Sequence, residues 1–232
     1  MTSKIYLIPS VLEELAVETI PPYIIDAVRD CTVIFAENER TARRFLKSIC
    51  KEIIIDAYEW FTIHKAEEEI LTVFKERVRE GKHIAIISEA GCPGVADPGQ
   101  ILIAAAQEMG ATIKPMVGPS SILLALMASG MNGQHFEFIG YLPIDIQERT
   151  KAIIALEASS QKNTSTKIFI ETPYRNNQLL ETLLKTCKPS TRLCIAAELT
   201  SAAEYIKTKT VGDWKKEKAD LHKKPVIFLL QG

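Results

Sequence analysis

The chain has 232 residues, of which 47% are hydrophobic and 25% charged, and its net charge is −1 at pH 7. This composition is typical of a globular protein, and it excludes an overall electrostatic attraction to nucleic acid, so any such affinity must come from local patches. The five cysteines have no CxxC spacing, so neither a disulfide framework nor a zinc site is predicted. We find no signal-peptide pattern and no apolar run near the roughly 20 residues that span a bilayer, so we expect a cytoplasmic protein without a membrane partner.

The first half of the chain alternates between apolar strand patterns and helical patterns. The predicted strands are Lys4–Ile8, Thr32–Ala36, Glu52–Asp56, His83–Ser88 and Thr112–Met116. The predicted helices between them are Pro22–Asp30, Glu39–Ser48, Lys65–Glu80 and Gly99–Gly110. Such alternation with short connections predicts a mainly parallel sheet that is covered on both faces.

The second half begins at the segment Val117–Ser121. Its Gly-Pro pair interrupts the regular pattern, and Ser120 is a favourable helix N-cap. We therefore predict one domain over residues 1–117 and another over 118–232. The predicted strands here are Phe136–Gly140, Thr166–Glu171, Arg192–Leu199, Glu204–Val211 and Pro225–Leu230. The predicted helices are Ile122–Ala128, Asp145–Ala158, Asn176–Thr186 and Gly212–Asp220, and the polar run Ser159–Ser165 is predicted as an exposed loop. Since the last three strands follow one another with little helix between them, part of this sheet is predicted to be antiparallel. The fold class is α/β, with two α/β domains and a cleft between them.

The segment Ile87–Gly99 carries the clearest sign of a binding site. It follows a buried strand pattern, contains three glycines and two prolines, and leads into a helix. In open α/β sheets, ligands bind beyond the carboxyl ends of the strands, and glycine permits close approach to the backbone. The loop has neither a dinucleotide nor a P-loop motif. Its backbone amides, the carboxylates of Glu89 and Asp97 and the hydroxyl of Ser88 suit a neutral or cationic ligand with an adenosine or amino acid part. The alternative is an ordinary connection, although such loops usually have only about 2–6 residues.

Three further motifs have the same character, because each follows an apolar strand pattern and precedes a helical one. They are Gly118–Ser121, Gly140–Pro143 and Glu171–Asn176. In α/β sheets such strand ends point toward one crevice. Taken singly, each is equally compatible with a turn, a helix cap or a strand end.

Together these motifs resemble the tetrapyrrole methylase superfamily, and within it the branch of ribosomal RNA small-subunit methyltransferase I. The branch pattern D-A-G-x-P-x-x-x-D-P-G is matched by Glu89–Gly99, G-P-S-[AS] by Gly118–Ser121 and E-[ST]-P-[HY]-R by Glu171–Arg175. E-L-T corresponds to Glu198–Thr200, and E-D-T-R is represented by Glu37–Arg40. The resemblance extends over essentially the whole chain.

The resemblance implies a two-domain fold with S-adenosylmethionine in the cleft, a small-subunit ribosomal RNA substrate and a homodimer. It also implies that the cofactor is bound by Ser88, Glu89, Ala90, Gly91, Val95, Ala96, Asp97, Ser120, Ser121, Leu142, Thr172, Tyr174 and Leu199. Asp97 could balance the positive charge of that ligand or cap the helix that follows it.

The chain departs from the branch pattern at three places. Where the branch has T-P-I-G-N after the first strand, this chain has Pro9–Glu14. In addition, Glu89 and Asn38 each replace an aspartate of the family pattern. The predicted cofactor half is therefore intact, whereas the predicted substrate half is altered.

Two glutamates are candidates for accepting the proton of a ribose hydroxyl during methyl transfer, Glu37 and Glu171. Each has a structural alternative, because Glu37 could pair with Arg40 and Glu171 with Arg175.

A basic stripe is the most direct sequence evidence for contact with RNA. Helical spacing places Arg40, Arg43, Arg44, Lys47 and Lys51 on one face. A second group of seven lysines lies between Lys207 and Lys224, and the aromatic side chains of Tyr58, Trp60 and Phe61 could stack on bases. A charge run of this kind is usually a solvated helix face, and core packing or a dimer contact is the alternative for the aromatics.

Three hypotheses follow for the function. The first is methylation of a ribose 2′-hydroxyl in small-subunit ribosomal RNA. The second is methylation of a tetrapyrrole or another small molecule. The third is a non-catalytic module that binds S-adenosylmethionine.

Overall fold

The computed structural model describes residues 2–63, 67–97 and 99–232, and the chain divides into two compact units, Met1–Ser120 and Ser121–Gly232. The predicted domain boundary before Gly118 lies close to this division. Pro98 and the start of the predicted helix Lys65–Glu80 lie outside the described residues.

The first unit is a five-stranded parallel sheet in the order β3-β2-β4-β1-β5. Its strands are β1 (Lys4–Ile8), β2 (Val33–Ala36), β3 (Glu59–Thr62), β4 (Ile84–Ile87) and β5 (Thr112–Pro115). Its helices are α1 (Ile24–Arg29), α2 (Glu39–Ile49), α3 (Glu67–Arg79) and α4 (Gln100–Glu108), with short 3-10 helices at Val17–Thr19 and Ile55–Ala57.

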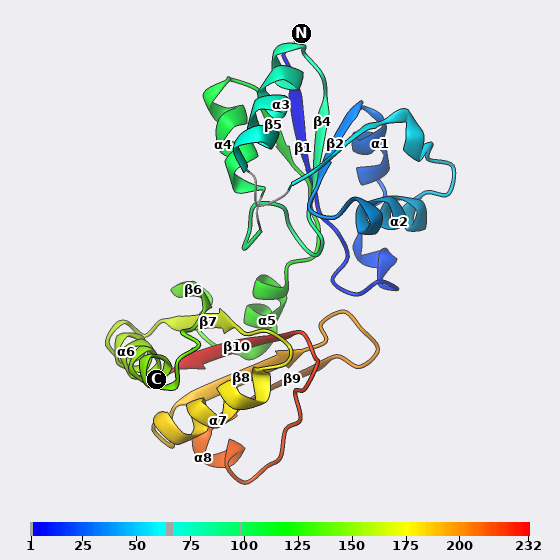
Figure 1. Cartoon of the computed structure of the whole chain (residues 1–232). Coiled ribbons are helices and arrows are strands. Elements are labelled where there is room, and N and C mark those ends of the chain that lie inside the picture. The colour runs from blue at the N-terminus through cyan, green and yellow to red at the C-terminus, as the bar shows by residue number, and fades with distance from the viewer. Residues whose placement is uncertain (1, 64–66, 98) are drawn as a thin grey trace. The chain divides into compact units, whose positions relative to one another are not determined.

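Alternate residues of β4 face opposite sides of the sheet, as the pleat requires. Ala85 and Ile87 pack with α1 and α2, whereas Ile84 and Ile86 pack with α3 and α4. Figure 1 shows the two helix pairs on the two sides of this sheet. The central strands are apolar on both faces because both faces are covered.

The third strand of this sheet differs from the prediction. The run Glu52–Asp56 is not a strand: it ends in the 3-10 helix Ile55–Ala57, and β3 follows at Glu59. Ile54 in that run is 72% exposed, whereas Phe61 of β3 stacks on Phe35 of β2 with ring centroids 5.0 Å apart. Stacking against the neighbouring strand therefore selects the aromatic segment over the isoleucine run.

The second unit is a mixed sheet in the order β6-β7-β10-β8-β9. Its strands are β6 (Phe136–Tyr141), β7 (Thr166–Ile170), β8 (Arg192–Ala197), β9 (Tyr205–Thr210) and β10 (Val226–Gln231). Only β6 and β7 pair in parallel, and the other neighbours are antiparallel, as predicted for the last three strands.

Helices cover both faces of this mixed sheet (Figure 1). They are α5 (Ser121–Ser129), α6 (Ile146–Asn163), α7 (Asn176–Thr186) and the short α8 (Val211–Trp214). Residues of α6, α7 and α8 share one apolar core with the strands, and the buried Trp214 side chain donates a hydrogen bond to the Leu193 carbonyl at 2.8 Å. α5 contacts β8, β9 and β10.

Two predictions for the second unit are wrong. The polar run Ser159–Ser165 is not an exposed loop, because α6 continues to Asn163 and ends at Thr164 in the left-handed region (φ 51°). The buried Ser160 hydroxyl donates to the Ser165 carbonyl at 2.6 Å and accepts from the Gly232 amide at 2.9 Å. The helix predicted over Gly212–Asp220 is only the single turn of α8.

None of the helices in the described part of the chain combines enough length and apolar character to cross a bilayer.

Close backbone packing near the ends of β1 and β5 makes one glycine replaceable only at a cost. A Cβ on Gly118 would lie 2.3 Å from Cβ and Cγ of Pro9, whereas a Cβ on Gly133 would meet no atom within 4 Å. We expect Gly118→Ala to lower the free energy of unfolding by about 1–3 kcal/mol, because the rigid proline ring must move. The matched control Gly133→Ala is expected to change it by less than about 0.5 kcal/mol, and urea unfolding of both variants measures the difference.

Candidate functional site

The loop that follows β4 is held against the loop that follows β1. Ser10 and Gly91 exchange two backbone hydrogen bonds, of 2.9 and 3.1 Å, and the Ser10 hydroxyl donates to the Ser88 carbonyl at 2.7 Å. Gly91 has φ +73°, a conformation that favours glycine. The sequence analysis missed Ser10 as a site residue, although its position directly after the first strand was a usable signal.

Three carboxylates of this unit come together at the carboxyl ends of β2 and β4. Glu37 follows β2, and its Oε2 accepts a hydrogen bond from the Glu89 amide at 3.2 Å. Asp97 is also hydrogen-bonded to Glu37. The Thr41 hydroxyl of α2 donates a longer hydrogen bond, of 3.5 Å, to Oε1 of Glu89. The structure thus joins Glu37 of one motif to Glu89 and Asp97 of another, about fifty residues further along the chain.

The cluster changes the protonation of Asp97. Burial, together with the hydrogen bond and negative charge of Glu37 and the charge of Glu89, raises the pKa of Asp97 to about 7, while a hydrogen bond with Ser88 opposes the shift. The N-cap position of α4 is Gly99, which has no side chain with which to cap the helix.

Glu37 and Glu171 have different surroundings. Glu37 forms no ion pair with Arg40 in the structure, and its hydrogen bonds go to the acidic cluster. Glu171, at the end of β7, accepts hydrogen bonds from Nε and Nη2 of Arg175 at 3.0 and 2.7 Å and from the Thr172 amide at 2.6 Å. Its side chain is only 1% exposed. The structural alternative considered for Glu171, a pair with Arg175, is thus present.

A cavity of about 160 Å³ lies beside the acidic cluster. Its walls include Ser10, Leu12 and Glu14 of the altered Pro9–Glu14 segment, together with Glu89 of the loop and Arg44 of α2. Arg44 pairs with Glu14 at 3.1 Å. The segment that departs from the family pattern therefore shapes a pocket next to the motif residues.

The other residues of the family motifs are divided between the two units. Those of the loop after β4, from Ser88 to Asp97, belong to the first unit, as does Ser120. Of these, Val95 is 52% exposed and Ala96 is held at φ 59°, while Ala90 is exposed. The residues that lie in the second unit are Ser121, Leu142, Glu171, Thr172, Tyr174 and Leu199.

Within the second unit, three of the motif segments lie at one edge of the sheet. β7 and β8 are both antiparallel to β10 and so run in the same direction, and β6 is parallel to β7. Leu142, Glu171 and Leu199 follow the carboxyl ends of β6, β7 and β8. The Leu142 and Leu199 side chains are buried, so only their backbone groups can face a ligand, whereas Tyr174 is 70% exposed.

The basic stripe is less available than its sequence indicates. Arg43 pairs with Glu39 and Asp56 at 2.8 and 2.9 Å, and its guanidinium lies 4.8 Å from the Trp60 ring centroid. Lys47 donates only to a backbone carbonyl, and no carboxylate of the described residues pairs with Arg40. Since Trp60 also donates to the Ile55 carbonyl at 2.9 Å, its contacts favour packing within the unit over base stacking.

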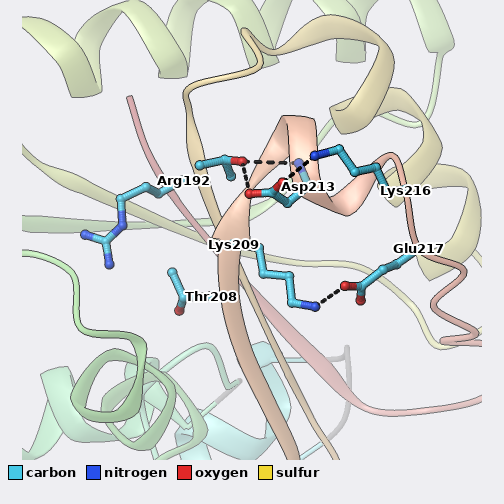
Figure 2. Close-up of a pocket in the computed structure, with 7 residues that line it drawn as sticks. Arg192, Thr208, Lys209, Asp213, Lys216 and Glu217 are labelled. Atoms are coloured by element: carbon cyan, nitrogen blue, oxygen red, sulfur yellow. Dashed lines mark hydrogen bonds and ion pairs between the residues drawn. The ribbon is translucent and has the colours of Figure 1, made fainter.

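Two lysines of the second group, Lys209 and Lys216, line a cavity of about 570 Å³ at β8, β9 and α8 (Figure 2). There Lys216 pairs with Asp213 at 2.8 Å and Lys209 pairs with Glu217. Arg192 in the same cavity donates to the Gly130 carbonyl and to Gln231. These ion pairs neutralise the two lysines that line the pocket, so the positive charge that is left there is that of Arg192.

The comparisons with known proteins agree with the motifs. The sequence profile of the Tetrapyrrole (Corrin/Porphyrin) Methylases matches residues 16–215. The chain is 28% identical to ribosomal RNA small subunit methyltransferase I of Escherichia coli O157:H7 over 99% of this chain and 78% of that protein. It is 30% identical to the protein of the same name from Xylella fastidiosa over 88% of this chain and 73% of that protein.

Solved structures show the same fold at low sequence identity. Diphthine synthase aligns with a TM-score of 0.68 and 13% identity over 99% of this chain and 89% of that chain. Uroporphyrin-III C-methyl transferase from Thermus thermophilus, complexed with S-adenosyl homocysteine, aligns with a TM-score of 0.55 and 14% identity over 99% of this chain and 97% of that chain. The chain therefore belongs to the tetrapyrrole (corrin/porphyrin) methylase family, and within it to the ribosomal RNA small subunit methyltransferase I group.

Proposed function

We propose that the chain is an S-adenosylmethionine-dependent methyltransferase that methylates a ribose 2′-hydroxyl of small-subunit ribosomal RNA. The observation that carries the proposal is the cluster of Glu37, Glu89 and Asp97 at the carboxyl ends of β2 and β4. It lies on the loop that matches the family motif. The names of the bacterial relatives supply the RNA substrate class.

The donor groups of the cluster fit this cofactor. Burial, the hydrogen bond with Glu37 and the negative charges of Glu37 and Glu89 raise the pKa of Asp97. A ligand that carries a sulfonium and an ammonium group relieves the charge repulsion among the three carboxylates. When bound, the cofactor supplies a methyl group already activated for displacement by its positive sulfur.

The residues of the chain then have two tasks. The cofactor site comprises backbone and side-chain groups of Ser88–Gly91, Val95–Asp97, Ser120, Ser121, Leu142, Thr172, Tyr174 and Leu199, and it orients the donor. Glu37 is the group we assign to accept the proton of the ribose hydroxyl, because its carboxylate has no cationic partner among the described residues. Glu171 instead holds Arg175 and positions the loop after β7.

We also propose that the enzyme acts in the cytoplasm as a homodimer. The thiols of all five cysteines are free, as suits a reducing compartment. Leu123 and Met127 of α5 are 51% and 78% exposed, and they offer apolar surface to a second copy. Light scattering of the purified chain measures the mass that decides this.

Asp97 makes cofactor binding depend on pH. With its pKa near 7, Asp97 is protonated below that pH, and a cationic ligand must displace the proton. We expect the affinity for S-adenosylmethionine to rise from about pH 6 to pH 8, with proton release on binding. Asp97→Asn is expected to flatten this dependence, and titration calorimetry in two buffers of different ionisation enthalpy measures it. An unchanged pH profile in Asp97→Asn would contradict the assignment.

The raised pKa of Asp97 also makes the stability of the fold depend on pH. The direction is opposite to that of a carboxylate in an ion pair, whose pKa is lowered by folding. Because its pKa is raised from 3.8 to about 7 by folding, the native state binds more protons than the unfolded state between these values. Stability from this group is therefore complete below about pH 4 and is lost as the pH rises to 7. Asp97→Asn is expected to be more stable than the natural chain at pH 8 and not at pH 4. Asp26→Asn, at an exposed position, serves as the control.

Methyl transfer tests the proposed function directly. Small ribosomal subunits from a strain that lacks this enzyme are incubated with the chain and methyl-labelled cofactor, and the labelled nucleoside is identified. We expect Glu37→Gln to reduce kcat by about 100-fold or more, because it removes the proton acceptor. The control is Glu108→Gln, at an exposed position on α4. Cofactor binding without labelled RNA would support a non-catalytic module, and label in a tetrapyrrole would support the small-molecule hypothesis.

The basic stripe gives a prediction for RNA binding. Arg43 and Arg44 are held by carboxylates, whereas Arg40, Lys47 and Lys51 have no carboxylate partner among the described residues and are available to bind phosphate groups. Arg40→Gln with Lys47→Gln is expected to lower the slope of log affinity against log salt by about 0.7 for each phosphate group that is no longer neutralised. Filter binding of ribosomal RNA fragments over a salt series measures the slope. An unchanged slope would assign the stripe to the solvated surface.

A further inference from the structure

A groove of about 650 Å³ runs between α6 and α7, outside the acidic cluster and the loops already described. Its walls are formed by Ile146, Arg149 and Ile154 of α6 and by Gln178, Glu181 and Lys185 of α7, together with threonines of both helices. Ile146 and Ile154 are 66% and 53% exposed. The groove thus combines apolar and polar surface.

Arg149 is the unusual member of this groove. The residue is 2% exposed, and its Nε has no hydrogen-bond partner. Within the part of the chain that the structure describes, no ion pair or side-chain hydrogen bond engages the guanidinium. An arginine side chain keeps its charge at any physiological pH, and a buried charge without a partner is strongly unfavourable. The groove is the route by which a counter-anion can reach it.

The other charged residues that line the groove do not neutralise Arg149, so its counter-anion must come from another molecule. Glu181 is its acidic wall residue, but its carboxylate lies 3.7 Å from the Lys185 ammonium and is 71% exposed. It therefore does not serve as the partner of Arg149. The exposed Gln178 amide adds hydrogen-bond donors at the groove.

The position of the groove relates it to the motif residues of the same unit. α6 and α7 begin shortly after the carboxyl ends of the parallel neighbours β6 and β7. Arg149 and Gln178 both lie in the first turns of their helices. The groove therefore starts near the sheet edge that carries Leu142 and Glu171 and leads away from it along the helices.

We propose that this groove binds the backbone of the RNA substrate, with the Arg149 guanidinium holding one phosphodiester group. This inference rests on the proposed function. The planar guanidinium matches two phosphate oxygens in a bidentate contact, and an RNA strand that leaves the sheet edge carries phosphates along the groove. Ile146 and Ile154 offer apolar surface to ribose and base faces.

The test measures RNA binding apart from catalysis. A short labelled oligocytidylate is titrated with the full chain over a salt series, and fluorescence anisotropy gives the affinity. We expect Arg149→Met to weaken binding about tenfold and to lower the salt slope by about 0.7. The thermal unfolding midpoint of the variant is expected not to fall, because an unpaired buried charge is removed.

A second pair of variants keeps the test independent of the buried site. Lys185 and Lys162 are exposed lysines near the ends of α7 and α6, but only Lys185 lines the groove. Lys185→Met is expected to lower the affinity and the salt slope, whereas Lys162→Met is expected to change the affinity less than twofold.

The proposal is wrong if the natural chain shows no salt-dependent affinity for the RNA, or if Arg149→Met and Lys185→Met both bind it like the natural chain. Methyl transfer by the natural chain to small ribosomal subunits, measured separately, distinguishes the two failures. Labelled RNA together with unaffected binding by the variants would refute the groove and leave the proposed function intact.

Discussion

The two backbone hydrogen bonds between Ser10 and Gly91 are the contact on which the arrangement of the first unit's site depends. They join the loops after β1 and β4, which are neighbours in the sheet, and Gly91 can form them because it tolerates a positive φ. The tight contact of Gly118 with Pro9 adds the start of the loop after β5 to the same assembly. The altered Pro9–Glu14 segment is therefore an integral wall of the site.

This rigid support allows an electrostatically unfavourable arrangement to persist. Glu37, Glu89 and Asp97 approach one another without a cation among the described residues to neutralise them, and burial together with the negative charges of Glu37 and Glu89 raises the pKa of Asp97. Functional sites often retain such charge repulsion because a ligand of opposite charge relieves it. The same reasoning connects the acidic cluster of the first unit with Arg149 of the second, where the uncompensated charge is positive.

The basic residues show why a charge pattern in a sequence is weak evidence for RNA binding. Arg43 and Arg44 share a helix face with Arg40 and Lys47, as their spacing predicts, but carboxylates distant in sequence neutralise the first two. Lys209 and Lys216 are also neutralised, by Glu217 and Asp213 of the neighbouring chain segment (Figure 2). In contrast, the sequence alone does not indicate Arg149 as a site residue, because a single arginine in a helical pattern carries no signal of burial.

The sequence by itself determined the α/β class, the parallel first sheet, the partly antiparallel second sheet and the family, because hydrophobic periodicity and short motifs are local properties. It did not determine that β3 is Glu59–Thr62 or that α6 continues through Ser160, since these depend on the stacking of Phe61 on Phe35 and on a hydrogen bond from the Gly232 amide. Only the tertiary structure decided that Glu37 shares a cluster with Asp97, that Glu171 is held by Arg175 and that Arg149 is buried without a partner. The Glu171–Arg175 pair, four residues apart, was one of two roles that the sequence left open for Glu171. The Glu37–Asp97 contact and the burial of Arg149 depend on residues distant in sequence, whose charges and burial no local pattern records.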